Sequence, residues 1–368
     1  MDFQIGVTGK ERAAMYIIRA DGNAKIGAGH LMRCMTIAGE LAEIDGGRDG
    51  ILFLCADAQS AALAAEHGFR AEALESDYRK MESELPLLEK GFGRCNPKSS
   101  HIILVDSYYV TDAYLEGLRA FGRVALLDDL GERRYPVDCV INYNACADGK
   151  RYKRLYEGSG TCLALGCGYV PVRAQFLNRK YRVRGEVKRV LITTGGGDID
   201  NIAGQILEKI EDGEREYTLV TGQFNPHFKE LKELERRRRN IHILHNVADM
   251  ESLMEKCDLA VTAGGSTIYE LAAVGVPFIC FSYAKNQEEL TKYIGEKNIA
   301  GYSGAFHIDR EGMLERLETL FEKLAGDFEQ RRLFHEKEQG MVDGGGAHRL
   351  ARILTELCGE GKETKENE

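Results

Sequence analysis

The stretch IIRADGNAKIGAGHLMRCMTIAGELAE, residues 17–43, decides the fold of the first half of the chain. An apolar run enters a polar, glycine-containing loop, and a segment of helical period follows at 30–44. The apolar positions of that segment fall near one face, namely Leu31, Cys34, Met35, Ile37, Ala38 and Leu41. This order predicts a strand, a loop and a helix. A histidine, His30, stands where the helix should begin.

Strand-length apolar runs alternate with helical segments along most of the chain. Runs at 15–20, 50–56, 101–107, 123–129 and 138–144 are typical of buried strands, and 59–68 of a helix. A second series has strands at 188–194, 215–222, 240–246, 258–263 and 276–283, with helices at 201–211, 250–257 and 266–274. Such alternation indicates doubly wound, mostly parallel sheets.

We therefore predict an α/β protein of two Rossmann-like domains, at 15–172 and 186–345, which face a central cleft. The basic stretch 173–188 would be the linker, and residues 1–14 and 359–368 would be flexible ends. Ligands should bind beyond the carboxyl ends of the strands.

Composition narrows the function. The chain has 368 residues and a net charge of -9, which argues against nucleic acid as a partner. No apolar run approaches the ~20 residues that cross a bilayer, so we expect no membrane partner. The ten cysteines form no CxxC pair and no zinc spacing, so we expect no metal site and a cytoplasmic protein with reduced thiols.

The loop in TAGGSTIYELAAVG, residues 262–275, is a candidate phosphate site. Gly264 and Gly265 let the backbone approach a ligand, and the helix that follows offers free N–H groups and a positive dipole end. Ser266 and Thr267 can add hydroxyl donors. The alternative is a capping box of Thr267 and Glu270, which needs no ligand.

A second glycine loop, TTGGGDIDN at 193–201, contains Gly196 and Gly197. Its alternative is a simple helix cap by Asp198. Two such loops in one domain favour a nucleoside diphosphate. Neither loop has the G-x-x-x-x-G-K-[ST] pattern of an ATPase, and GAGHLM after the first strand departs from G-x-G-x-x-G, so a dinucleotide is not favoured.

His30 is the candidate general base. On the first turn of a helix the dipole disfavours a second positive charge, so we expect a neutral ring that can accept a proton. Gly27 and Gly29 leave room for a substrate beside it. The alternative is a histidine that only caps or packs.

Two more strand ends carry polar side chains. Asp106 and Tyr108 should emerge at the same sheet edge as His30. Asn286 and Gln287 follow the strand at 276–283, and their amides suit sugar hydroxyls or an acetamido group. The alternative for Asn286 is a helix N-cap.

These segments together resemble one family. The pattern is IRADGNAKIGAGHLMRCMTIA, LVDSYY, LLDD, DCVINYN, LGCGYVPVRAQF, TTGGGDIDN, TAGGSTIYELAAVGVPFICF and KNQ, in order over about residues 15–300. It resembles the UDP-2,4-diacetamido-2,4,6-trideoxy-β-L-altropyranose hydrolases of pseudaminic acid biosynthesis. That family has the GT-B fold of sugar-nucleotide glycosyltransferases and is similar to the N-acetylglucosaminyltransferase that makes lipid II. It cleaves the bond from the anomeric carbon to UDP with inversion and without a metal or other cofactor.

The resemblance implies roles for particular residues. His30 matches the proposed base for the attacking water, and the sugar-site positions correspond to Asp21, Tyr108 and Asn286, with Gln287 beside them. The UDP positions are Gly264, Gly265, Ser266 and Thr267, with Glu270 at a ribose-binding position. Apart from the resemblance, we expect Gly29, Gly196 and Gly197 of the other glycine loops to contact UDP. Cys167 and Pro171 depart from the expected pattern, and the chain has extra length at 1–14, around 75–98 and after 340. Partner enzymes of the same pathway are candidates for docking on this extra length.

The resulting prediction is a UDP-sugar hydrolase. Two alternatives stay open: a GT-B glycosyltransferase whose histidine deprotonates an acceptor hydroxyl, and a non-catalytic nucleotide-sugar-binding module.

Overall fold

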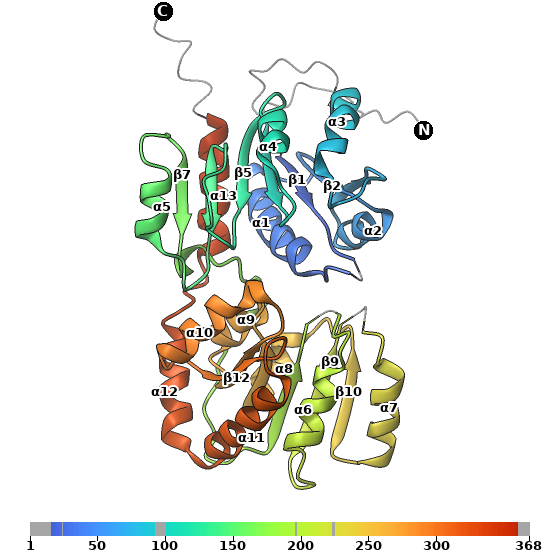
Figure 1. Cartoon of the computed structure of the whole chain (residues 1–368), viewed down its shortest axis with the longest axis vertical. Helices are drawn as coiled ribbons and strands as arrows, with labels where there is room; N and C mark the ends of the chain where they lie inside the picture. Colours follow the sequence, from blue (N-terminus) through green and yellow to red (C-terminus); the bar gives the residue numbers. More distant parts are fainter. Residues whose placement is uncertain (1–15, 24, 93–100, 196, 223–224, 360–368) are drawn as a thin grey trace, which may run out of the picture. The chain divides into compact units, whose positions relative to one another are not determined.

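A computed structural model describes residues 16–23, 25–92, 101–195, 197–222 and 225–359 (Figure 1). They form two compact units. Unit 1 contains the chain up to Asn23, His30–Pro171 and the residues from Gly345 onward, and unit 2 contains 25–29 and Val172–Gly344. The predicted flexible ends lie outside the described residues, except for residue 359.

Unit 1 is a seven-stranded sheet with helices on both faces. Its elements are β1 (Tyr16–Ala20), α1 (Gly29–Asp45), β2 (Ile51–Cys55), α2 (Ala58–Glu66), β3 (Arg70–Ala73), η1 (Met81–Glu84), α3 (Leu85–Phe92), β4 (Ile102–Asp106), α4 (Asp112–Leu118), β5 (Arg123–Leu127), β6 (Cys139–Asn142), α5 (Gly149–Leu155), β7 (Cys162–Leu165), η2 (Cys167–Tyr169) and α13 (Gly346–Gly359).

The strand order in unit 1 is β3-β2-β1-β4-β5-β6-β7, and every pair is parallel. Each of the strands β1, β2 and β4 has five residues, and all of them are buried, as expected for strands covered on both faces. The sequential order reverses between β1 and β4, where Ala20 pairs with Asp106. The loops after these two strands diverge to opposite faces of the sheet, which makes this the point where α/β sheets bind ligands.

Unit 2 repeats this plan with six parallel strands in the order β10-β9-β8-β11-β12-β13. Its elements are η3 (Ala174–Phe176), β8 (Arg189–Thr193), α6 (Ile202–Ile210), β9 (Glu216–Thr221), α7 (Phe228–Arg237), β10 (Ile241–His245), α8 (Met250–Lys256), β11 (Leu259–Ala263), α9 (Thr267–Val274), β12 (Phe278–Ser282), η4 (Lys285–Gln287), α10 (Glu288–Glu296), β13 (Gly301–Ala305), α11 (Arg310–Gly326) and α12 (Phe328–Gln339).

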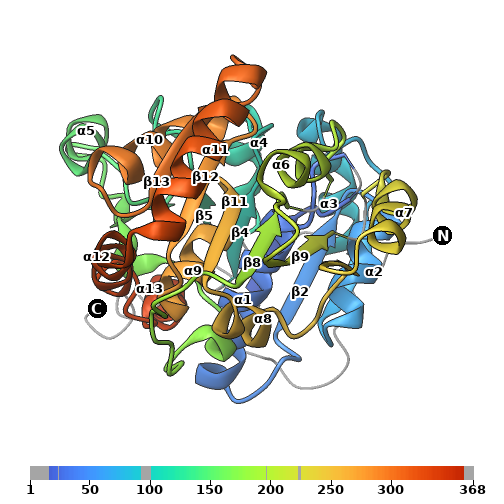
Figure 2. The same ribbon diagram turned by 90° about the horizontal axis from the view of Figure 1, so that it is seen from below.

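The helices of unit 2 cover its sheet from two sides. Figure 2 shows α6 and α11 on one face and α8 and α9 on the other. A continuous apolar cluster joins α6, α7 and α11 to the sheet, with Ile206, Leu231 and Phe321 among its members. Here the order reverses between β8 and β11, so both glycine loops of this half lie at the switch point of their sheet.

The prediction of two Rossmann-like α/β halves is confirmed, and the face predicted for α1 is buried at all six positions. Several elements were missed: β3, β7, β13 and the helices α3, α4, α5, α11, α12 and α13. Strand β13 has the sequence GYSGA, which contains no apolar run, so only its neighbours in the sheet make it a strand.

The stretch 173–188, predicted as a linker, packs on unit 2. The guanidinium of Arg184 donates to Asp258 Oδ1 at 2.8 Å, and buried Arg331 donates to the carbonyls of Arg184 and Gly185 at 2.8 Å. These contacts fix the stretch as part of the fold.

Candidate functional site

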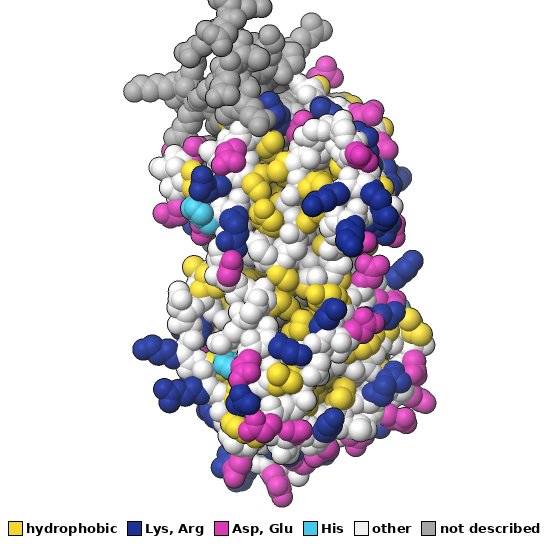
Figure 3. Space-filling view, turned by 90° about the vertical axis from the view of Figure 1, so that its left-hand side faces the viewer, with side chains coloured by type: hydrophobic (Ala, Val, Ile, Leu, Met, Phe, Trp, Pro, Cys, Tyr) yellow, Lys and Arg dark blue, Asp and Glu magenta, His cyan; other side chains and the backbone are white. Residues whose placement is uncertain are grey.

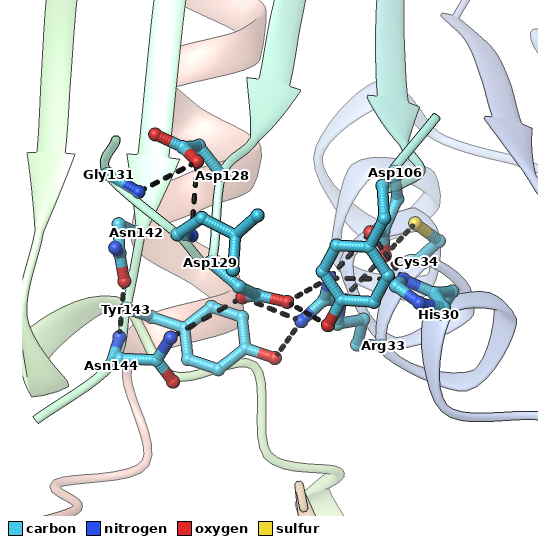
Figure 4. Close-up of polar contacts among 12 residues, drawn as sticks. His30, Arg33, Cys34, Asp106, Asp128, Asp129, Gly131, Asn142, Tyr143 and Asn144 are labelled. Atoms are coloured by element: carbon cyan, nitrogen blue, oxygen red, sulfur yellow. Dashed lines mark hydrogen bonds and ion pairs between the residues drawn. The ribbon is translucent and has the colours of Figure 1, made fainter. Parts of the chain in front are cut away.

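A cluster of polar side chains lies at the carboxyl ends of β4, β5 and β6 in unit 1 (Figure 4). His30, on the first turn of α1, meets the carboxylate of Asp106 with Nδ1 at 2.7 Å from Oδ1. The His30 side chain is 13% exposed and the Asp106 side chain 1%. The predicted proximity of these two residues is therefore seen in the structure.

Arg33 lies one helical turn after His30 and holds the cluster together. Its guanidinium makes a two-pronged pair with Asp106, at 2.5 Å for both contacts, and a second one with Asp129, at 3.0 and 2.9 Å. It also donates to the hydroxyl of Tyr143 at 2.7 Å. Such paired contacts suit the planar fork of arginine and fix the geometry of both carboxylates.

The charges of this cluster set the state of Asp106. Burial alone would raise the pKa of this carboxyl, but Arg33 and His30 hold the pKa well below its usual range. Asp106 is therefore an acceptor only. Arg33 Nη2 lies 3.2 Å from Nδ1 of His30 but 2.5 Å from Asp106 Oδ1, so it donates to the carboxylate. Because a carboxylate cannot donate, a hydrogen bond at 2.7 Å between Asp106 and Nδ1 of His30 requires Nδ1 to carry the proton. The proton-accepting lone pair of a neutral ring is then on Nε2.

Other neighbours complete the surroundings of His30. The ring of Tyr108 meets the His30 ring edge-on with centroids 4.7 Å apart, and its hydroxyl donates to Asp129 at 2.9 Å. The buried thiol of Cys34 lies 3.6 Å from Asp106 Oδ2, and burial raises the pKa of that thiol well above its ordinary value. It stays protonated and can donate to the carboxylate.

Asp21, a predicted sugar contact, is engaged within unit 1. It is buried, and its oxygens accept from the N–H of Ala56 at 2.6 Å and from Arg19 at 2.6 Å. These contacts tie the ends of β1 and β2 together, so we do not carry Asp21 forward as a sugar ligand.

In unit 2 the loop between β11 and α9 differs from a capped helix start. Ser266 is the N-cap residue and makes no side-chain cap hydrogen bond. Glu270 pairs instead with Arg173, at 2.9 Å, so the capping-box alternative is wrong. Among the hydrogen bonds of the described residues, the backbone N–H groups of Ser266 and Thr267 have no acceptor. These are the orphan donors that an anion can take.

The two glycines of this loop have different surroundings. A Cβ on Gly264 would lie 2.5 Å from Cγ2 of Thr291 and 3.0 Å from Cβ of Gln287, so this glycine is required by packing. A Cβ on Gly265 would meet nothing within 4 Å, and the same is true of Gly29 at the start of α1. Gly265 and Gly29 therefore border open space.

In the second glycine loop, a side chain of the loop itself binds the N-terminus of the helix that follows, α6. Asp198 is buried and accepts from the N–H groups of Ile202 and Ala203 at 2.7 and 3.0 Å. It therefore binds the first N–H groups of α6, but this helix begins at Ile202 with Asn201 as its N-cap residue, and not at Ile199 with Asp198 as its N-cap. Gly197 is partly exposed, and Gly196 lies outside the described residues. An anion at the start of α6 would have to compete with this carboxylate.

The remaining predicted residues lie near the β11–α9 loop of unit 2 or on it. Asn286 and Gln287 form η4, before α10, so Asn286 is not the N-cap of that helix. The side-chain oxygen of Gln287 accepts from Tyr283 N–H at 2.8 Å. Burial raises the pKa of Glu270, and Arg173 offsets part of that effect.

Sequence reasoning missed Arg33, Asp129, Tyr143 and Asn144 as members of the His30 cluster. Asn144 lies 3.5 Å from Asp129 through its amide nitrogen. A signal was present, because Arg33 is three residues after His30 on the same helix face and LLDD and INYN both end strands.

Within the described ranges, no group of three or more His, Cys, Asp or Glu side chains is arranged to hold a metal ion. No helix in those ranges is both long and apolar enough to span a bilayer.

Comparison with known proteins adds to this geometry. Residues 189–335 match the glycosyltransferase family 28 C-terminal domain. A crystal structure of MurG from Acinetobacter baumannii superposes with a TM-score of 0.61 at 13% identity, covering 93% of this chain and 99% of that one. The fold is GT-B.

Two relatives found by sequence comparison are longer than the part of them that this chain matches. The uncharacterized protein MJ1062 of Methanocaldococcus jannaschii is 24% identical over 311 residues, which is 80% of this chain and 62% of that protein. The pseudaminic acid cytidylyltransferase and UDP-2,4-diacetamido-2,4,6-trideoxy-beta-L-altropyranose hydrolase of Helicobacter pylori is 30% identical over 125 residues, which is 33% of this chain and 22% of that protein. The chain thus spans less than two thirds of each of these relatives.

Proposed function

We propose that this protein hydrolyses a UDP-linked diacetamido-trideoxy sugar to UDP and the free sugar. The observation that carries the proposal is the pair formed by His30 and Asp106. A proton fixed on Nδ1 by a buried carboxylate leaves Nε2 to receive a proton, which is the arrangement of a general base. The partial similarity to the hydrolase of Helicobacter pylori supports the choice of substrate.

The proposed reaction is a displacement at the anomeric carbon. Water gives its proton to Nε2 of His30 while its oxygen bonds to the anomeric carbon, and the bond from that carbon to the UDP oxygen breaks. Attack opposite the leaving group inverts the configuration. The imidazolium that forms lies beside the Asp106 carboxylate, which stabilises it.

The diphosphate is proposed as a ligand of unit 2. Charge that grows on the leaving group would be met by the free N–H groups of Ser266 and Thr267 and by the positive end of α9. The open space beside Gly265 suits the approach of a phosphate. Glu270, held by Arg173, is the proposed ribose contact.

The test is proton NMR of the purified protein with UDP-diacetamido sugars and no acceptor. We expect UDP and a free sugar whose first anomeric signal has the opposite configuration to the substrate. Tight binding of UDP without turnover of any sugar nucleotide would refute hydrolysis and favour a binding module.

A glycosyltransferase is the second candidate, favoured by the match of residues 189–335 to the glycosyltransferase family 28 C-terminal domain. His30 would then deprotonate an acceptor hydroxyl. UDP release that requires an added acceptor would establish this activity in place of hydrolysis.

Neither candidate involves nucleic acid. Figure 3 shows basic and acidic side chains of the described residues interspersed over the face that it views. A nucleic-acid surface would instead concentrate the positive charge.

A further inference from the structure

The segment that follows β3 is tied to the sheet of unit 1 by a buried ionic cluster. Arg19 of β1 is 1% exposed and donates to both oxygens of Glu84, at 2.8 and 2.6 Å. Tyr114 and Ser76 donate to the same carboxylate at 3.0 and 2.8 Å. Burial lowers the pKa of Arg19, but Glu84 and Asp21 raise it by more, so the guanidinium stays charged. Breaking a buried pair of this kind is costly, which fixes the segment in place.

The path of this segment crosses the carboxyl edge of the sheet. The N–H groups of Leu74 and Ser76 donate to the carbonyls of Cys55 and Ala56, at the end of β2, at 2.7 and 2.9 Å. Two residues later, Tyr78 contacts Tyr109, which follows β4. Because β2 and β1 lie between β3 and β4, the loop 74–80 reaches from one edge of the sheet to the switch point.

The result is an aromatic pair beside the His30 cluster. The rings of Tyr78 and Tyr109 are 5.4 Å apart at an interplanar angle of 70°, and the guanidinium of Arg79 lies 5.7 Å from the Tyr78 ring. Tyr109 is 41% exposed, and the preceding Tyr108, which contacts His30, is 43% exposed. Successive exposed aromatic side chains next to a polar cluster are typical of ligand contacts.

We propose that Tyr78 and Tyr109 form a carbohydrate-binding surface that receives the apolar C–H face of a glycosyl ring. Tyrosine supplies a large, rigid contact with a polar tip. Asp77 and Arg79, which pair with each other at 3.0 and 3.1 Å, border the surface. The identity of the sugar follows from the proposed function, on which this inference rests. The ring belongs either to the sugar nucleotide itself or to an acceptor glycoside.

The experiment is saturation-transfer NMR with two probes, UDP-N-acetylglucosamine alone and methyl N-acetyl-β-D-glucosaminide in the presence of UDP. Wild type is compared with Tyr78→Ala and Tyr109→Ala, and Tyr109→Phe tests whether the ring alone suffices. Phe328→Ala removes an aromatic side chain of similar exposure, 37%, from unit 2 and is the matched control. UDP release from the UDP-diacetamido sugars of the proposed function is measured in parallel, without acceptor.

We expect each alanine variant to weaken binding of one probe by about three- to tenfold, the scale of an aromatic contact, and Tyr109→Phe and Phe328→Ala to bind as wild type does. Loss of the UDP-sugar signal assigns the surface to the donor sugar, and loss of the glycoside signal assigns it to an acceptor. Unchanged binding of both probes in Tyr78→Ala and Tyr109→Ala overturns the proposal, even if UDP is released. Absence of UDP release with a weakened probe refutes the hydrolase and leaves the surface intact.

Discussion

The switch points of the two units have the same topology but are lined by different groups. In unit 1 the ends of β1 and β4 lead to charged side chains, with Arg33 between Asp106 and Asp129. In unit 2 the ends of β8 and β11 lead to glycine loops, and the β11 loop leaves two backbone N–H groups without an acceptor in the part of the chain that the structure describes. In the proposed function the shared topology places both sites at switch points, and the residues at each switch point assign proton transfer to unit 1 and anion binding to unit 2.

His30→Ala should have the largest effect of the substitutions that distinguish the two units. If proton transfer belongs to unit 1 alone, turnover should fall by ~10² to 10⁴, the usual contribution of a general base. The dissociation constant for UDP should stay unchanged, because its proposed ligands are in unit 2. Initial rates and isothermal titration with UDP measure the two quantities. Full turnover in the variant would remove His30 from the mechanism.

Asp106→Asn should have the next largest effect. An amide in place of the carboxylate can donate to Nδ1 of His30 and so favours the wrong tautomer, which we expect to lower kcat by about 10²-fold with little change in KM. Nitrogen-15 NMR of the imidazole reports the tautomer directly. Asp129→Asn is the matched control, because it alters the same arginine pair but leaves the contact between His30 and Asp106. Equal losses in the two variants would show that Asp106 only supports the fold.

The two units also differ in how a buried carboxyl group affects stability. The pKa of Asp106 in unit 1 is lowered, so its interactions stabilise the fold above the unfolded-state pKa and are lost as the pH falls. Glu338 in unit 2 is fully buried, and neither of its oxygens has a hydrogen-bond partner among the described residues. Burial raises the pKa of Glu338 well above its ordinary value, and the nearby Phe278 N–H offsets only part of this.

Glu338→Gln should therefore stabilise the protein increasingly as the pH rises. A raised folded-state pKa means that the wild type loses stability between the unfolded value of about 4.3 and the folded value, by roughly 1.4 kcal/mol per pH unit. Chemical denaturation at several pH values measures the difference between variant and wild type. A difference that does not change from pH 5 to pH 8 would show that Glu338 is ionised throughout.

Substitutions at the two glycines of the β11 loop distinguish an effect on ligand binding from an effect on packing. Gly265→Ala adds a methyl group to open space, so we expect normal stability with UDP affinity reduced about tenfold, or 1.4 kcal/mol. Gly264→Ala places a Cβ against Thr291 and should instead destabilise the fold by about 1–3 kcal/mol. Titration with UDP and thermal unfolding of both variants provide the measurements. The reverse pattern would move the anion site away from Gly265.

Much of this arrangement could be predicted from local pattern. The apolar face of α1, the strands around it and the edge shared by His30, Asp106 and Tyr108 follow from periodicity and from parallel pairing. The contacts of Arg33 with Asp129 and Tyr143 could not be predicted in this way. They join residues 96 and 110 positions apart and depend on the register of β5 and β6. The contact of Asp21 with Arg19 could not be predicted either, because a polar residue at a strand end gives no sign that its partner is a buried arginine of the same strand.

The smallest effect is expected at the other glycine loop. The Asp198 carboxylate accepts from the first two N–H groups of α6, so Asp198→Ala should cost about 1–2 kcal/mol of stability, the usual contribution of a side chain that satisfies such groups. If the β11 loop alone binds the diphosphate, the affinity for UDP should not change. A gain in affinity would mean that removing the carboxylate had opened a second anion site at α6, and that the two loops differ only because Asp198 closes one of them. Thermal unfolding together with UDP titration of this single variant decides between these outcomes.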